Sequence, residues 1–97
     1  MSRLERFVAR LATTTDVACA VIAPGATMTY LTGWGAHGSE RLTLLFVRPD
    51  GRLAALVPKL EEQGAREAFM RNRVACEFFS HADDEGPQRA LADLLAA

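Results

Sequence analysis

The sequence has few cysteines, no metal-ligand motif and no excess of basic charge, and each absence excludes a class of protein. Only two cysteines occur among 97 residues, and neither a CxxC nor an HExxH spacing is present, which argues against a disulfide scaffold and a zinc module. Eleven basic and twelve acidic side chains give a formal net charge of -1. The electropositive footprint of a nucleic-acid-binding protein is therefore missing, and we expect no nucleic-acid partner.

Long apolar runs are also absent. The longest, residues 17–23, is too short to cross a bilayer. The charged beginning of the chain, residues 1–6, has no apolar segment behind it, unlike a secretory signal peptide. We therefore expect a cytoplasmic protein with no membrane partner. In that compartment Cys19 and Cys76, which both lie in apolar runs, are predicted to be buried thiols without a disulfide.

The first part of the chain carries the patterns of a helix and a strand. Apolar residues recur at helical spacing over residues 4–11, and Ser2 with Glu5 forms a capping-box sequence, so a helix is predicted there. The apolar run of residues 17–23 ends at Pro24-Gly25. This run predicts a strand covered on both faces, as in an interior parallel strand, although a short buried helix is the alternative.

The remainder predicts a hairpin followed by two more helices and one strand. Residues 42–47 and 53–57 flank Pro49-Asp50-Gly51, a sequence that favours a tight turn between antiparallel strands. The later elements are a helix over residues 59–71, a strand over 74–79, a turn over 80–86 and a helix opened by Pro87. Two sets of side chains are expected to face inward from these helices: Leu60, Ala65, Ala68 and Phe69 from the first, and Leu91, Leu94 and Leu95 from the second. The order α, β, β-hairpin, α, β, α indicates one α/β domain with a mixed sheet.

Three groups of residues resemble chemical sites but are explained more simply. The acidic group of His81, Asp83, Asp84 and Glu85 could attract a cation, yet acids before Pro87 also stabilise a helix N-terminus. We therefore predict no metal site and no catalytic residues in this chain. Ser39 near His37 lacks an orienting acid, and the glycines of residues 33–38 lack the strand and helix that a dinucleotide fingerprint needs.

The stretch TYLTGWGAHGSER, residues 29–41, is the candidate functional segment. Tyr30 and Gly33 are predicted to be structural, with Tyr30 filling the edge of the core at a turn between two strands. Trp34, His37, Glu40 and Arg41 could stack on, or hydrogen-bond to, a small substrate. An ordinary polar loop between strands explains the same residues, and both interpretations stay open at this point.

The segment TMTYLTGW, residues 27–34, resembles the N-terminal domain of the creatinase/prolidase/Xaa-Pro aminopeptidase family. The strand sequence of residues 16–22, the Asp50-Gly51 turn and Val57-Pro58 before an acidic helix follow the family in the same order. Thr27 stands where the family usually has Asn, and Trp34 where it has Phe. The resemblance implies that residues 1–97 form a three-layer αβα sandwich, with a ribonuclease H-like mixed sheet that contains a β-hairpin.

The same resemblance implies a function. In the family this domain precedes a catalytic pita-bread domain, which hydrolyses the bond before proline with a pair of divalent metal ions and whose motifs are absent here. We therefore expect a non-catalytic domain of a proline-specific metallopeptidase, a hydrolase that forms a homodimer or higher homo-oligomer. The loop with Trp34, His37, Glu40 and Arg41 is expected to approach a partner subunit's active site. The alternatives are a stand-alone dimerisation or binding module and the N-terminal domain of a creatinase-like amidinohydrolase.

Overall fold

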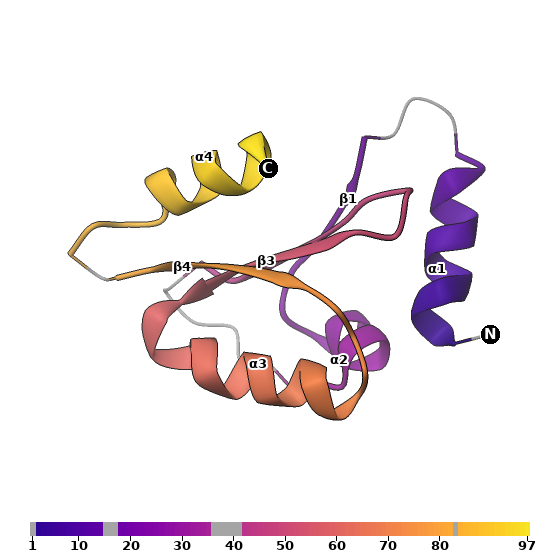
Figure 1. Ribbon diagram of the computed structural model, residues 1–97, viewed down its shortest axis with the longest axis horizontal. Coiled ribbons are helices and arrows are strands. Elements are labelled where there is room, and N and C mark those ends of the chain that lie inside the picture. Colours follow the sequence, from indigo (N-terminus) through magenta and orange to yellow (C-terminus); the bar gives the residue numbers. More distant parts are fainter. Residues whose placement is uncertain (1, 15–17, 36–41, 83) are drawn as a thin grey trace.

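The computed structural model describes residues 2–14, 18–35, 42–82 and 84–97, and within them a mixed sheet has helices on both faces (Figure 1). The strands, in their order across the sheet, are β1 (Ala20–Ile22), β2 (Leu44–Val47), β3 (Leu53–Pro58) and β4 (Glu77–His81). The helices are α1 (Arg3–Ala12), α2 (Ala26–Thr32), α3 (Glu62–Arg71) and α4 (Gln88–Ala96), and a 3-10 turn, η1 (Lys59–Glu61), precedes α3.

The predicted hairpin is confirmed. β2 and β3 pair antiparallel, with Leu45 opposite Ala55, and the turn closes through a hydrogen bond of 2.9 Å from the Gly51 N–H to the Arg48 carbonyl. Gly51 has φ of 92°, which a glycine adopts without strain. β1 pairs antiparallel with β2, whereas β4 runs parallel to β3 and is reached through α3.

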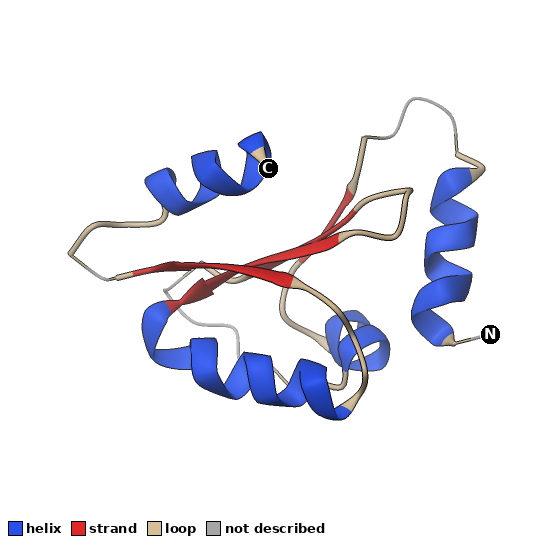
Figure 2. Cartoon of the chain, in the orientation of Figure 1, coloured by secondary structure: helices blue, strands red, loops and turns tan. Residues whose placement is uncertain are grey.

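Alternate residues of the hairpin strands point to opposite faces of the sheet and build two cores. Leu45, Val47 and Val57 face a core shared with α1, α2 and α3, and Phe46 and Leu56 face a second core with Leu94 of α4. Figure 2 shows α4 on one side of the red sheet and α2 and α3 on the other. The expected layered α/β fold with a mixed sheet is thus confirmed.

The first helix has the predicted capping box. The Ser2 hydroxyl accepts from the Glu5 N–H at 3.0 Å, and the Glu5 carboxylate accepts from the Ser2 N–H at 3.1 Å. The hydrogen bond that the Glu5 carboxylate accepts from the Ser2 backbone is the main cause that lowers the pKa of Glu5. None of the α1 side chains is fully buried, and the helix covers the core that it shares with α2 and α3 from outside through the partly buried Leu4, Phe7, Val8 and Leu11.

The nature of β1 was predicted wrongly. It is a three-residue strand at the edge of the sheet, pairs antiparallel and leaves Val21 52% exposed. The side chains do alternate between buried and exposed, but every residue of the run is apolar. The sequence therefore hides the alternation, and burial on both faces was the wrong interpretation.

Four further expectations require correction. Residues 26–32 form helix α2, where no helix was predicted. The last strand is Glu77–His81, so His81 belongs to a strand and not to a turn. Leu60, at 80% exposure, lies in η1 and points away from the core, because a 3-10 turn does not continue the phase of α3. Leu95 is 59% exposed, whereas Ala65, Ala68, Phe69 and Leu94 are buried as predicted.

Candidate functional site

Gly33 caps the end of helix α2 inside the candidate segment of residues 29–41. Its φ of 78° is left-handed, and its N–H donates to the Thr29 carbonyl at 2.8 Å. A Cβ at this position would overlap the side-chain amide of Asn72, which is held by a 2.8 Å hydrogen bond to the Ala68 carbonyl. The left-handed backbone conformation therefore favours glycine here, and a Cβ would in addition displace the Asn72 amide.

Trp34 is fixed in place directly after this glycine. The Thr32 side chain is fully buried, and its hydroxyl donates to the Met28 carbonyl at 2.7 Å while it accepts from the Trp34 N–H at 3.1 Å. The Trp34 indole packs edge-on against Phe69, with ring centroids 6.1 Å apart, and Phe69 packs in the same manner on Phe78 at 5.1 Å. The first residue after the end of α2 and its glycine cap, Trp34, is thus held in place by the Thr32 hydroxyl and the Phe69 ring.

The other members of the predicted substrate-access loop, His37, Glu40 and Arg41, lie outside the described residues. Trp34, which is partly buried, is the member whose surroundings are known. The grouping of these four side chains around a substrate stays a prediction.

Tyr30 was expected in the core and is instead 53% exposed. Because residues 26–32 are helical, the buried side of α2 carries Met28, Leu31 and Thr32, and Tyr30 faces outward. Its ring lies under the Arg3 guanidinium of α1, 4.5 Å from the ring centroid. The signal that could have indicated this arrangement was the three-residue spacing of Met28 and Leu31 between Gly25 and Gly33.

The described members of the acidic group, His81, Asp84 and Glu85, do not form a metal-binding cluster. His81 is 7% exposed, and its Nε2 lies 2.7 Å from the Leu42 carbonyl oxygen, to which it donates as an N–H. Asp84 and Glu85 are exposed, and Asp83 lies outside the described residues. Among residues 2–14, 18–35, 42–82 and 84–97, no three side chains of metal-binding type come close enough to hold an ion.

Cys19 and Cys76 are free thiols, and each is only partly buried, whereas full burial was predicted. Cys19 packs against the α4 side of the sheet and Cys76 against the opposite side. Burial, followed by the negative charge of Glu77, raises the pKa of Cys76 to about 12. This thiol is therefore protonated at neutral pH and is a poor nucleophile.

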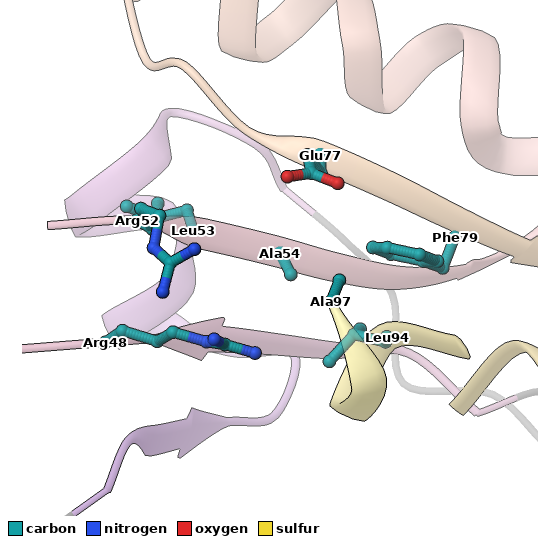
Figure 3. Close-up of a pocket in the computed structure, with 8 residues that line it drawn as sticks. All are labelled: Arg48, Arg52, Leu53, Ala54, Glu77, Phe79, Leu94 and Ala97. Carbon is teal, nitrogen blue, oxygen red and sulfur yellow. The ribbon is translucent and has the colours of Figure 1, made fainter. Parts of the chain in front are cut away.

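A pocket beneath the end of α4 is too small for a substrate. Figure 3 shows Arg48, Arg52 and Glu77 around it, with Leu94 entering from the helix. Its volume is about 20 Å³, which is room for a single water molecule.

None of the helices in the described part of the chain has the length and apolar character that a membrane-spanning helix needs.

The fold and the helix-to-loop connection define a three-layer α/β domain with a mixed sheet and a Tyr-Leu-Thr-Gly helix end. Residues 3–97 match the family model of the creatinase/prolidase N-terminal domain, and the chain belongs to this family. A comparison with curated proteins finds no match.

The similar solved structures include several dipeptidases. A domain of a dipeptidase from Streptococcus thermophilus is 29% identical with a TM-score of 0.83, and the match covers 100% of this chain and 69% of that one. A proline dipeptidase from Streptococcus pneumoniae is 28% identical with a TM-score of 0.80, covering 96% and 64%. A dipeptidase from Pyrococcus horikoshii is 33% identical with a TM-score of 0.74, covering 97% and 24%. This chain thus corresponds to part of the length of each of these proteins.

Proposed function

We propose that this chain is the non-catalytic N-terminal domain of an Xaa-Pro dipeptidase or aminopeptidase. The observation that carries the proposal is the family match over residues 3–97. One of the similar structures is described as a proline dipeptidase, and two others as the N-terminal domains of an X-Pro dipeptidase and of an Xaa-Pro dipeptidase. These descriptions favour a peptidase over a creatinase-like amidinohydrolase or a module without an enzyme.

The catalytic chemistry is assigned to another part of the parent protein. The larger part of the Pyrococcus dipeptidase has no counterpart in this chain, which covers 24% of it. The side chains described in this chain do not fit a two-metal centre, since no three metal-binding groups converge among them. The proposed pair of divalent ions would be held by the catalytic domain, where it would polarise the scissile carbonyl and supply a hydroxide.

The purified 97-residue chain is expected to show no hydrolysis of an Xaa-Pro dipeptide with manganese, cobalt or zinc. Peptide hydrolysis needs a group that activates water together with one that stabilises the oxyanion, and we assign neither to this domain. The measurement is proline release, compared with metal alone and with a mock purification. Metal-dependent turnover that rises in proportion to this chain and is absent from the mock sample would contradict the proposal.

Within an oligomer, we assign to the loop that starts at Trp34 a role in substrate access to a partner subunit's active site. Support comes from the base of the loop: Trp34 is held by the Thr32 hydroxyl and by the Phe69 ring. A segment with a fixed base can present side chains at a reproducible position, which a binding surface requires.

The loop is tested in a Pyrococcus dipeptidase whose matching N-terminal segment is replaced by this domain. Trp34→Ala, His37→Ala and Arg41→Ala are each expected to lower kcat/KM on an Xaa-Pro dipeptide about fivefold or more, equivalent to roughly 1 kcal/mol of transition-state stabilisation. Met70→Ala, at a side chain 77% exposed on α3, serves as the control and should change nothing. Sedimentation monitors the oligomer. If all three variants keep kcat/KM within about twofold while the oligomer persists, the loop is only a connection.

A further inference from the structure

A groove runs between α1 and α2 on the outside of the domain. Phe7, which is partly buried, and Leu31, which is buried, form its apolar floor, and Tyr30 stands at its side. Its volume is about 420 Å³, which is within the range of sites that hold a small ligand or several side chains. The residues named here as lining the groove all belong to the described part of the chain.

The rim of the groove is cationic. Arg3, Arg6 and Arg10 line it, and their spacing of three and four residues places them on one face of α1. Within the described segments the ion pairs are Arg52–Asp50 and Arg66–Glu62, and none involves these three arginines. The one acid of α1, Glu5, is engaged in the capping box with Ser2.

Charge is distributed unevenly between this helix and the remainder of the chain. Three arginines against one glutamate give α1 a charge of +2, whereas the whole chain carries -1, so the remainder carries -3. The net positive charge of α1 thus contrasts with the net negative charge of the remaining chain.

Tyr30 adds an aromatic contact and orders part of the rim. The Arg3 guanidinium rests over its ring at 4.5 Å from the centroid, a cation–π arrangement. A guanidinium held in this manner loses less conformational freedom when it binds a ligand than a free side chain does. The groove therefore combines an apolar floor with a partly ordered set of cationic donors.

We propose that the groove binds an acidic polypeptide segment. An apolar side chain of the segment enters between Phe7 and Leu31, and its carboxylates pair with the arginines, whose planar donor forks match a carboxylate. An extended nucleic acid fits less well, because the remainder of the domain repels a long polyanion and a phosphate backbone offers nothing to the apolar floor. The proposal is independent of the peptidase assignment.

The test uses a fluorescent synthetic peptide in which glutamates flank a leucine pair, titrated with the 97-residue chain. Combined Arg6→Gln and Arg10→Gln is expected to raise Kd about tenfold, since two charge-assisted contacts are lost. Tyr30→Ala should also weaken binding. Arg71→Gln, at an exposed arginine on α3 that does not line the groove, is the matched control and should bind as the unmodified chain does.

Changes in the peptide separate charge from apolar contact. Replacing glutamates with glutamine, replacing leucines with alanine, or raising the salt concentration should each weaken binding. Equal Kd values for the Arg6/Arg10 double variant and the Arg71 control would overturn the proposal. So would tighter binding of a single-stranded oligonucleotide of equal charge. Self-association that the double variant abolishes, without any peptide binding, would identify a second copy as the occupant and would also overturn it.

Discussion

Replacing Phe69 with alanine is expected to lower the free energy of unfolding by about 3–5 kcal/mol, the usual cost of truncating a buried phenylalanine. Phe69 is 1% exposed and lies between two other rings, with centroids 6.1 Å from Trp34 and 5.1 Å from Phe78. Its loss would leave a cavity between α3 and the sheet and would remove both edge-on aromatic contacts. The same substitution would also loosen the base of the candidate loop.

Urea denaturation monitored by circular dichroism measures this effect. Met70→Ala is the matched control, because Met70 is the next residue of the same helix but is 77% exposed, and it should change stability by no more than about 0.5 kcal/mol. Trp34 is the one tryptophan of the chain, so its fluorescence should shift to longer wavelength in the folded Phe69→Ala variant. Equal stability losses in the two variants would show that the aromatic cluster does not belong to the core.

Elements specified by neighbouring residues were predictable from the sequence. The capping box of Ser2 and Glu5, the turn at Pro49-Asp50-Gly51 and the helical spacing of Ala65, Ala68 and Phe69 all involve interactions within a few positions of the chain. Each of these signals has a local physical cause, and the structure contains each of the features that they predict.

Helix α2 was not predictable in the same manner. Its sequence, ATMTYLT, contains three threonines and a tyrosine, which favour strands. A seven-residue helix of this composition would not form alone. Burial of Met28 and Leu31 against the sheet, together with the hydrogen bond from the Thr32 hydroxyl to the Met28 carbonyl, stabilises it. The burial is a tertiary interaction that a single sequence does not display, whereas the hydrogen bond lies within the helix itself.

The surroundings of the candidate site also depend on contacts between residues far apart in the chain, which the sequence does not show. Trp34 could be recognised as a residue able to bind a substrate, but its contact with Phe69 joins residues 35 positions apart in the chain. The cationic groove was missed for the same reason, because it exists only where α1 and α2 meet. Helix α2 therefore connects both surfaces: Tyr30 stands beside the groove, and Thr32 holds the first residue of the loop.

Gly33→Ala is expected to destabilise the domain by about 2–4 kcal/mol, from two separable causes. The left-handed conformation, at φ of 78°, costs an alanine roughly 1–2 kcal/mol. The new Cβ would also overlap the Asn72 amide, which must then move and give up its hydrogen bond to the Ala68 carbonyl. The displacement of Asn72 accounts for the remaining part of the cost.

A double-mutant cycle separates these causes. In an Asn72→Ala background the overlap is gone, so Gly33→Ala should cost only about 1–2 kcal/mol for its backbone conformation, and the two substitutions should couple by about 1 kcal/mol or more. Gly64→Ala is the control with the opposite sign: Gly64 lies inside α3 with no atom within 4 Å of an added Cβ, and alanine there should stabilise by about 0.5–1 kcal/mol. An unchanged cost of Gly33→Ala in both backgrounds would rule out the contact with Asn72. A stabilising Gly33→Ala would mean that α2 does not end at a left-handed residue.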